Sequence, residues 1–470
     1  MFELDFSYSV LLVVCLLAAC GFEFVNGFHD TANAVATVIY TNSLKPWVAV
    51  IWSGVWNFIG VLAGGIGVAM GIVYLLPVES LVDQSVSHSI AMVMALLISA
   101  IAWNLATWYL GIPCSSSHTL IASILGVGIA YSLLPDANEA AVNWGKAQEI
   151  GISLLVSPLF GFSMVIVLMF LLRYFTKNTK HGDSLFKEPK KNAPPPLWIR
   201  SILILTCTGV SFFHGSNDGQ KGVGLMMLIL IGIVPGYFAL NNAVAPESLQ
   251  GSFKKIEYVI NSIDSSQLAA PDRVKLSQTI SMHQKLSAKL NTTADVELIA
   301  RSERFDIRKD IMVMDRNLNG LLKKEELVMS EKDKALLKKS LKEVRTLTDF
   351  APQWVVLMIS FSLGIGTMIG WKRIVKTIGE KIGKEHLTYA QGASAELIAT
   401  STIGVSTYFG LPVSTTHVLS SGIAGSMVAS KGIKNLQGDT VRNILIAWFL
   451  TLPVVLLLSG TLFLLFRSLL

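Results

Sequence analysis

The sequence predicts an all-α protein that crosses a membrane many times and is built from two related halves. Three observations support this fold class. The 470 residues are 52% hydrophobic and only 15% charged, whereas a soluble chain usually carries about a quarter charged residues. Apolar runs near the roughly 20 residues needed to cross a bilayer recur along most of the chain. Two polar motifs each occur twice, in the same order.

Ten apolar segments are expected to form the membrane helices. They lie at 8–41, 46–76, 88–110, 113–134 and 149–172, and then at 201–238, 351–371, 389–409, 412–430 and 442–466. The first segment of each set is too long for one straight helix across about 30 Å of hydrocarbon. We therefore expect both to break or fold back at a Gly-x-x-Asp motif, so that broken or re-entrant helices bring the total to about ten to twelve segments.

Polar stretches between these runs predict the domain boundaries. A basic, proline-rich linker is expected at 173–200, and a hydrophilic insert at 242–350 is long enough to fold as a small helical domain. The first transmembrane repeat then covers 1–172. The second repeat covers 201–241 and 351–470, on either side of the insert.

The distribution of basic residues predicts which loops are cytoplasmic. Short loops rich in Lys and Arg stay in the cytoplasm, so we expect 173–200 and the basic loop 372–388 to lie inside. Counting each apolar segment as one crossing then places the N-terminus, the acidic loop 77–87 and the insert 242–350 outside. The net charge of +6 is concentrated in the two basic loops, so it does not indicate binding to nucleic acid.

Two pairs of motifs indicate that the halves are related. "GIPCSSSHTLIASILGVGIA" at 111–130 and "GLPVSTTHVLSSGIAGSMVA" at 410–429 are identical at 8 of 20 positions. "NGFHDTANAV" at 26–35 and "HGSNDGQKGV" at 214–223 share a glycine, an aspartate and a valine. Each half carries five apolar segments, and an odd number makes the second copy enter the membrane from the opposite side. The sequence therefore predicts an inverted-topology repeat, as in many secondary transporters.

Carboxylates within the apolar segments are candidate sites for a coupling ion. An ionisable group inside a membrane is costly and usually functional. Asp30 and Asp218 occupy equivalent places in the two halves, and Glu23 and Glu396 are two further carboxylates. A pair near the midplane can bind a cation or carry a proton. The alternative is that these residues end helices at the water interface, as aspartate often does, but the duplication favours a functional pair.

Two clusters of hydroxyl residues after a proline are the candidate anion site. Proline tolerates the first helical turn, and serine or threonine caps free backbone N–H groups. Such helix N-termini bind anions, and two of them from inverted halves can converge on one anion. The alternative is that the hydroxyls only join helices. The candidate ligands are Ser115, Ser116, Ser117, Ser414, Thr415 and Thr416, and the adjacent His118 and His417 either titrate or cap helices.

The motifs resemble the signatures of the Pit family of low-affinity inorganic phosphate transporters. "NGFHDTANAVATVIYT", "HGSNDGQKG", "GIPCSSSHTLIASILG" and "GLPVSTTHVLSSGIAG" match in sequence and order, over nearly all of the membrane portion. The resemblance implies phosphate uptake across the bacterial inner membrane, by symport of protons with a neutral complex of phosphate and a divalent metal such as magnesium or calcium. Relatives elsewhere use sodium. Arsenate has nearly the same shape and charge as phosphate, and the choice between monomer and homodimer is left open.

The chain departs from the family pattern, which is close to Gly-x-Asn-Asp-x-x-Asn. The first copy has His29 where Asn is usual, and the second has Gln220 and Lys221 in place of the later Asn. A lysine where sodium ligands are expected argues for protons, and it could also meet phosphate as a point charge. We expect Asn33, Asn217 and Gln220 to assist the two aspartates, and these three residues and Lys221 are further candidate substrate ligands.

The insert contains a sequence that fits a calcium-binding loop. "DRNLNGLLKKEE" at 315–326 matches the pattern D-x-[DN]-x-[DN]-G-x5-E. The alternative is a chance Asn-Gly turn between two helices, since no partner loop is found. With only two carboxylates, calcium binding is expected to be weak, at about 10⁻⁴–10⁻³ M. The ligands would be the side chains of Asp315, Asn317, Asn319 and Glu326 and the carbonyl of Leu321.

Other classes of function fit the sequence less well. An intramembrane hydrolase needs a nucleophile hydrogen-bonded to a base, but Ser117 and His118 are neighbours that point apart on a helix. A passive anion channel does not need the carboxylates, so coupling to a gradient would distinguish it. A calcium-sensing receptor would be favoured by tight calcium binding without transport. The sequence therefore favours a symporter and not an enzyme.

Overall fold

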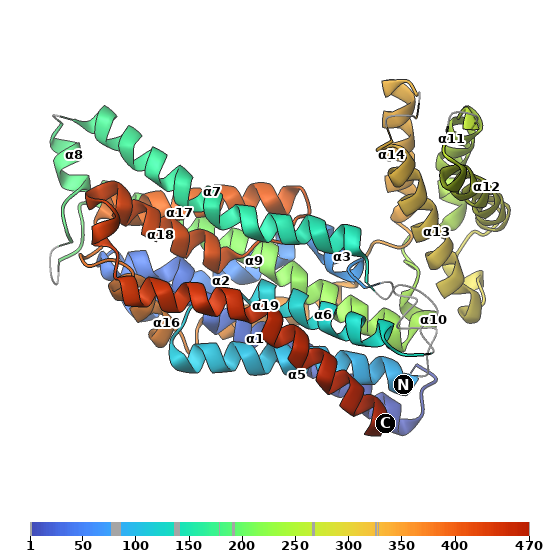
Figure 1. Cartoon of the computed structure of the whole chain (residues 1–470), viewed down its shortest axis with the longest axis horizontal. Helices are drawn as coiled ribbons and strands as arrows, with labels where there is room; N and C mark the ends of the chain where they lie inside the picture. The colour runs from blue at the N-terminus through green and yellow to red at the C-terminus, as the bar shows by residue number, and fades with distance from the viewer. Residues whose placement is uncertain are drawn as a thin grey trace. The chain divides into compact units, whose positions relative to one another are not determined.

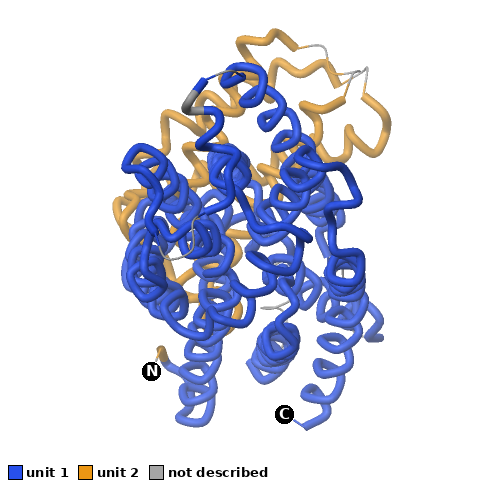
Figure 2. Tube along the Cα trace, turned by 90° about the vertical axis from the view of Figure 1, so that its left-hand side faces the viewer, with its two compact units in different colours: residues 1, 3–229, 351–470 blue, residues 2, 230–350 orange. Residues whose placement is uncertain are grey.

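The computed structural model describes residues 2–76, 86–135, 142–177, 179–189, 193–265, 268–324, 327 and 329–469. The regular elements in these ranges are helices, and the β-type pairing among them is one isolated bridge between Gly383 and Leu436. The chain divides into two compact units (Figure 2). The larger, called here the membrane unit, contains Glu3–Ile229 and Ala351–Leu470, and the smaller contains Phe2 and Leu230–Phe350. The predicted all-α class is confirmed.

The membrane unit is a bundle of long apolar helices (Figure 1). Its first half contains α1 (Phe6–Tyr40), α2 (Pro46–Ala63), α3 (Gly67–Val73), α5 (Val86–Leu110), α6 (Ser116–Ser132), α7 (Trp144–Thr176) and α8 (Lys180–Leu185). Its second half contains α9 (Leu197–Ile233), α15 (Gln353–Thr367), α16 (Lys372–Lys376), a π-helical turn (Thr377–Lys381), α17 (Tyr389–Tyr408), α18 (Thr415–Lys431), a 3-10 turn (Ile433–Asn435) and α19 (Gly438–Leu469).

Several of these helices are suited to crossing a membrane. Among the described residues, α1, α2, α5, α7, α9 and α19 are long and apolar enough to do so. A seventh span is possible if α15 and the helical stretch Lys372–Lys381, which are bent by 54° at a short break, are counted together. The chain is therefore a multi-pass membrane protein, and the predicted number of ten to twelve segments stays a prediction.

The predicted breaks in the two long segments are wrong. α1 continues through Asp30 and α9 continues through Asp218 without interruption. The motif glycines serve close packing instead: a Cβ on Gly27 would lie 2.6–2.8 Å from backbone atoms of α15, and one on Gly215 would clash with the backbone of α2. Neighbouring helices donate hydrogen bonds to the two motif aspartates, so the backbone does not need to unwind around them.

A break occurs instead within the segment predicted at 46–76. α2 and α3 are separated at Gly64–Ile66, where Gly65 has a φ of 73° that favours glycine. The side chain of Gln220 on α9 holds this break. Its amide donates to the carbonyl of Gly64 and accepts from the N–H of Val68 at 2.8 Å.

The two serine-rich motifs fold into the same local structure. Gly111 and Gly410 follow α5 and α17, and both have a φ of 68°. The residue after each glycine donates its N–H to the carbonyl five positions earlier, at 3.0 Å in the first copy and 2.8 Å in the second, as in a Schellman motif. Ser115 and Ser414 then cap α6 and α18, each accepting from the N–H of the third following residue at 3.2 Å.

Both loops predicted to be cytoplasmic lie at one end of the membrane unit. In the view of Figure 1, α8 from the linker and α16 from the basic loop are at the left end of the bundle. The beginning of α1 and the end of α19 are at the opposite end. This arrangement agrees with the expected sidedness, which stays a prediction. Most of the acidic loop 77–87 lies outside the described residues.

The smaller unit is helical, as predicted for the insert, and it begins earlier than residue 242. Its core is made by the apolar faces of the longer helices, with Phe253, Ile311 and Leu341 among the buried side chains. The guanidinium of Arg308 is buried and donates to carbonyls near both ends of the unit. Its elements are α10 (Pro235–Phe238), η1 (Pro246–Leu249), α11 (Gln250–Asn261), α12 (Ala270–Leu290), η3 (Val296–Leu298), α13 (Arg301–Leu321) and α14 (Glu331–Arg345).

The predicted calcium loop is not a loop in its first half. α13 continues to Leu321 and therefore includes Asp315, Asn317 and Asn319. Residues two positions apart lie on opposite sides of an α-helix, so these three side chains do not converge on one ion. Glu326 lies outside the described residues. The structure therefore contradicts the predicted loop conformation, and we do not propose calcium binding there.

Packing explains why the Asn-Gly sequence is helical. Met314 and Leu318 are buried in the core of the smaller unit, so the helix gains apolar burial by continuing. Asp315 accepts a hydrogen bond from Asn319 at 3.0 Å and pairs with Arg345 at 3.3 Å. Burial raises the pKa of the Asp315 carboxyl, and the nearby Arg345 opposes this shift.

Candidate functional site

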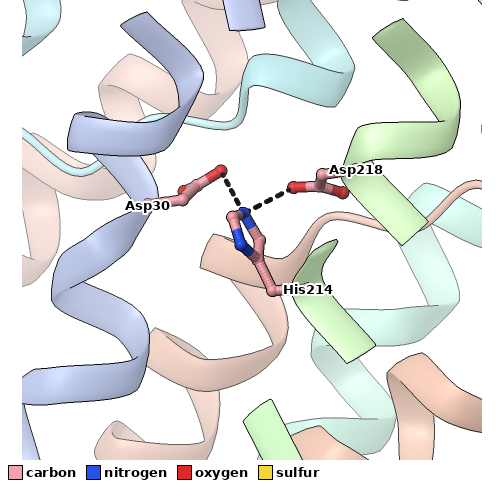
Figure 3. A group of neighbouring side chains, drawn as sticks. All are labelled: Asp30, His214 and Asp218. Atoms are coloured by element: carbon pink, nitrogen blue, oxygen red, sulfur yellow. Dashed lines mark ion pairs between the residues drawn. The ribbon is translucent and has the colours of Figure 1, made fainter. Parts of the chain in front are cut away.

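The two duplicated aspartates meet at one buried site. Asp30 comes from α1, and Asp218 and His214 come from neighbouring turns of α9 (Figure 3). His214 Nε2 lies 3.5 Å from Asp30 Oδ2 and 3.1 Å from Asp218 Oδ2, so the imidazole bridges the two carboxylates. Its other ring nitrogen, Nδ1, is 2.7 Å from the side-chain oxygen of Asn57 on α2. None of the three bridged residues is more than 2% exposed.

Asp30 is surrounded by neutral donors from both halves of the chain. Ser116, in the first turn of α6, donates its hydroxyl to Asp30 Oδ2 at 3.0 Å. Thr416, in the first turn of α18, donates to Asp30 Oδ1. The amide of Asn33, one turn along α1, donates to the same oxygen at 3.0 Å. The two predicted hydroxyl clusters and this aspartate therefore belong to one site.

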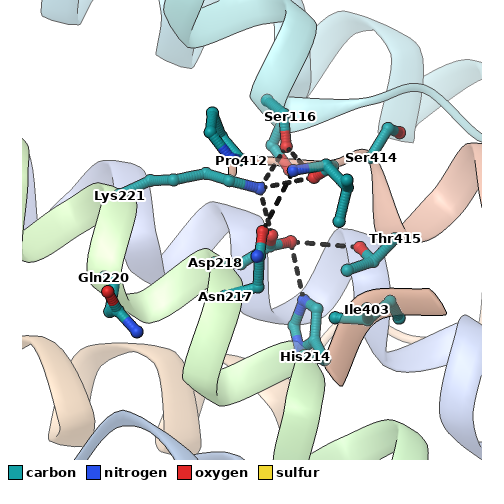
Figure 4. Close-up of polar contacts among 12 residues, drawn as sticks. Ser116, His214, Asn217, Asp218, Gln220, Lys221, Ile403, Pro412, Ser414 and Thr415 are labelled. Atoms are coloured by element: carbon teal, nitrogen blue, oxygen red, sulfur yellow. Dashed lines mark hydrogen bonds and ion pairs between the residues drawn. The ribbon is translucent and has the colours of Figure 1, made fainter. Parts of the chain in front are cut away.

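Asp218 has a charged partner as well as a hydroxyl donor (Figure 4). Thr415, at the start of α18, donates to Asp218 Oδ2 at 3.0 Å. The ammonium of Lys221 donates to Asp218 Oδ1, to Ser117 Oγ at 2.5 Å and to the carbonyl of Val413 at 2.6 Å. Lys221 is thus held by three oxygen atoms of three different groups.

The contacts around the two aspartates repeat. The amide of Asn33 donates to Asp30 and, at 3.2 Å, to the hydroxyl of Thr416. In the other half, the ammonium of Lys221 makes the equivalent two contacts, to Asp218 and to the hydroxyl of Ser117. An amide in one half and an ammonium in the other therefore fill corresponding positions. The alignment of the two halves pairs Asp30 with Asp218, Asn33 with Lys221, Ser116 with Thr415, and Ser117 with Thr416.

Four of the predicted substrate ligands hold backbone groups. Ser115 and Ser414 cap helices, as described above, and Gln220 holds the break between α2 and α3. Asn217 donates to the carbonyl of Leu411 at 3.2 Å and accepts from a backbone N–H at 3.2 Å, which supports the turn before α18. Their contact with substrate stays a prediction.

The two glutamates lie in different surroundings, and both are fully buried. Glu23 accepts from the amide of Asn26 at 3.1 Å, and its other oxygen has no hydrogen-bond partner among the described residues. Glu396, on α17, accepts from the hydroxyls of Thr37 and Thr206, the latter at 2.5 Å. The partners of Glu396 are thus separate from those of the two aspartates.

The two cluster histidines contact each other. The rings of His118 and His417 have centroids 4.4 Å apart, and His417 also stacks on Trp448 at 3.8 Å. His118 Nδ1 is 2.8 Å from the hydroxyl of Ser115. Because one histidine follows each capping serine, this contact joins the first turns of α6 and α18. The prediction that His118 and His417 either titrate or cap helices stays open between these two roles.

Sequence reasoning missed His214. It is the first residue of "HGSNDGQKG" and precedes Asp218 by four positions, which places both on one face of a helix. The signal was overlooked because the equivalent residue in the first half is Asn26. Among the described residues, Asp30, His214 and Asp218 form the one group of three or more His, Cys, Asp or Glu side chains that could hold a metal ion. Their ligand atoms lie within 4.8 Å of one another. Carboxylate and imidazole donors suit divalent metals.

A helical membrane bundle in which charged groups and helix N-termini from two halves meet at a buried site is typical of secondary transporters. Comparison with known proteins agrees. The sequence pattern of the phosphate transporter family matches residues 26–459, and the chain belongs to that family. The predicted family resemblance is confirmed, and the family places the chain among transporters and not enzymes.

Curated relatives and one solved structure resemble the chain over nearly its whole length. The low-affinity inorganic phosphate transporter PitA of Escherichia coli strain K12 is 41% identical, over 98% of this chain and 97% of its own. PitB of the same strain is 40% identical over the same shares. A solved structure described as the sodium-dependent phosphate transporter matches with a TM-score of 0.56 at 18% identity, over 98% of this chain and 100% of its own. This last likeness supports the fold alone.

Proposed function

We propose that the chain imports inorganic phosphate across the bacterial inner membrane by ion-coupled secondary transport. The observation that carries this proposal is the meeting of Asp30 and Asp218 with hydroxyls from both serine and threonine clusters. These hydroxyls lie in the first turns of α6 and α18, where free N–H groups favour an anion. The curated relatives are low-affinity phosphate transporters, which supports phosphate as the substrate.

Phosphate travels as a neutral complex with a divalent metal in this proposal. Asp30, His214 and Oδ2 of Asp218 would hold the metal, because their ligand atoms already lie together. Oδ1 of Asp218 keeps its contact with Lys221. Ser116, Thr415 and Thr416 now donate to the two carboxylates. When the metal occupies the carboxylate oxygens, these hydroxyls become available to phosphate oxygens. The metal and the anion thus enter as one cargo, which lowers the cost of desolvating either charge alone.

Protons drive uptake, and the two halves alternate access to the site. The repeated Schellman turns and serine caps support a pair of structurally related halves, and we extend this to an inverted repeat. Rocking of one half against the other would then expose the site to each side in turn. The contact between His118 and His417 joins the two helix starts that must move.

Sodium coupling is the second candidate, and the sodium-dependent transporter of similar fold is the observation that favours it. Lys221 argues against it, because a fixed ammonium already occupies oxygen atoms that a sodium ion would need. A passive anion channel is the third candidate. It leaves the buried carboxylates without a role.

Uptake of labelled phosphate into proteoliposomes tests the proposal. A pH gradient and a sodium gradient are imposed separately and together, each with and without magnesium. We expect accumulation that follows the pH gradient and requires magnesium. Accumulation that follows sodium alone would change the coupling ion, and mere equilibration under every gradient would identify a channel.

A further inference from the structure

The two aspartates differ in the charge of their partners. Asp218 contacts the ammonium of Lys221, whereas the amide and the two hydroxyls that donate to Asp30 are neutral. The one titratable group near Asp30 among the ion pairs of the described residues is His214, which lies closer to Asp218. Asp30 therefore shares its positive partner with Asp218, whereas Asp218 also has the ammonium of Lys221. A buried carboxylate is costly unless its charge is well paired, so a further cation would stabilise Asp30.

The contacts of Lys221 are those of a bound cation. Its ammonium touches a carboxylate, a hydroxyl and a backbone carbonyl, from Asp218, Ser117 and Val413. Oxygen atoms of these kinds are the usual ligands of hard cations. Lys221 is only 2% exposed, so water does not compete strongly for these contacts. The corresponding residue in the first half, Asn33, brings an amide without charge, and its side-chain oxygen is buried without a partner among the described residues.

We propose that Lys221 is a tethered cation that permanently neutralises Asp218, and that the exchangeable cation of each transport cycle binds at Asp30. A lysine cannot leave with the substrate, so the second half contributes a fixed charge. The first half has Asn33 at the same position and leaves Asp30 to a mobile cation. This inference rests on the proposed ion-coupled transport and identifies the half of the chain that carries the coupling.

The charge moved per phosphate tests this division of roles. It is measured from the membrane voltage at which net phosphate flux is zero, in proteoliposomes of the full chain. Lys221→Asn gives the second half the residue of the first and frees Oδ1 of Asp218 to take a further mobile cation. We expect this variant to move one more positive charge per phosphate than the unmodified chain. Lys221→Arg keeps the charge, so the number of charges moved should stay the same.

Two further variants make the test independent of how well Lys221→Asn folds. Asp218→Asn combined with Lys221→Asn removes the pair together, so uptake becomes slower but keeps the charge per phosphate of the unmodified chain. Asp30→Asn removes the exchangeable site, so a gradient should no longer drive accumulation. Repeating the measurements with proton, sodium and magnesium gradients identifies the mobile cation.

The outcomes separate this inference from the proposed function. If the double variant still carries phosphate but a gradient no longer drives its accumulation, the inference is overturned. It is also overturned if a monodisperse Lys221→Asn protein moves the same charge per phosphate as the unmodified chain. If the unmodified chain itself shows no gradient-driven uptake, ion coupling fails and the inference fails with it.

Discussion

The imidazole of His214 distinguishes this site from one made of oxygen ligands alone. Imidazole suits zinc, copper, iron and nickel, whereas carboxylate and carbonyl oxygens suit magnesium, calcium and manganese. His214 lies between Asp30 and Asp218, within ligand distance of a common metal. If phosphate enters as a metal complex, as proposed above, the chemistry of His214 bears on which metal is carried.

We predict that His214→Asn weakens uptake of zinc or nickel phosphate by about 10-fold or more, because even an outer partner of a metal ligand is typically worth 10–100-fold in affinity. Uptake of magnesium phosphate should fall less, because magnesium relies on the carboxylates. Asn is the residue of the first half at this position. The measurement is phosphate uptake with each metal in turn.

His29→Asn is the matched control for that substitution. His29 is also buried, next to Asp30 in the sequence, but its ring bonds to the hydroxyl of Thr107 at 3.2 Å and lies outside the three-residue group. The variant His29→Asn should leave unchanged the order in which the metals support phosphate uptake. Equal shifts in both variants would mean that His214 acts through packing and not as a ligand.

Duplication made part of this site predictable from sequence. The sequence predicts a pair of carboxylates, Asp30 and Asp218, and separately predicts that hydroxyls of the two clusters converge on one anion. The structure brings both groups together, with Ser116, Thr415 and Thr416 donating to the two aspartates. His214 escaped the same reasoning because its counterpart in the other half is not a histidine. A search for residues shared by the two halves does not find residues that differ between them, yet these differing residues give the two halves different charges.

Within the helix starts, the structure separates capping groups from groups that face the aspartates. We predict that Ser115→Ala and Ser414→Ala each cost about 1 kcal/mol of stability, because each removes an N-cap. Thr415→Val removes a hydroxyl that donates to Asp218. It should therefore raise the KM for phosphate, and it should lower Tm less than the two capping variants do. Thermal unfolding in detergent and initial uptake rates measure the two effects. A larger KM change for the capping serines than for Thr415 would contradict this assignment.

The packing of α1 against α15 gives a second test with an internal control. A Cβ on Gly27 would meet backbone atoms of α15 at 2.6–2.8 Å, whereas one on Gly21 of the same helix would meet nothing within 4 Å. We predict that Gly27→Ala destabilises the chain by about 1–3 kcal/mol, because the two backbones must separate. Gly21→Ala should be neutral or stabilising, because alanine favours a helix by up to about 1 kcal/mol.

The measurement for both glycine variants is thermal unfolding together with phosphate uptake. Equal Tm values would show that the helices can move apart without cost, and the close approach would then have no energetic role. A loss of uptake in Gly27→Ala alone, at a temperature where both variants are folded, would show that the spacing of α1 and α15 positions Asp30.

Local patterns predicted the helices better than their interruptions. Glycine near Asp30 and the Asn-Gly sequence near Asp315 both suggested a departure from helix, yet both lie inside continuous helices. In the first case glycine allows two backbones to approach, and in the second apolar burial outweighs turn preference. Local sequence shows that helix propensity is low at these glycine positions. Whether the helix is interrupted there depends on its packing against neighbouring helices.

For the chain as a whole, composition and repeats were enough to predict two related helical halves with an inserted helical unit. Which way each half faces is a different question, because the fold of a half is the same in either orientation. Basic residues supply the orientation through their interaction with the cytoplasmic side. The sidedness of the insert therefore depends on the two basic loops and can be tested apart from the fold.

Cysteine labelling in spheroplasts tests that sidedness. Glu257 on α11 of the smaller unit and Lys381 in the basic loop are exposed, so a cysteine at either position can react where water reaches it. Three of the four native cysteines are buried, and Cys20, the fourth, is replaced by serine to lower the background. We predict that a membrane-impermeant maleimide labels Glu257→Cys in intact spheroplasts and Lys381→Cys only after permeabilisation. Detergent-treated samples of both variants give the full extent of labelling. The reverse pattern would place the insert in the cytoplasm. Labelling of both cysteine variants in intact spheroplasts would mean that the insert and the basic loop lie on the same side of the membrane. The predicted order of ten crossings does not allow that arrangement.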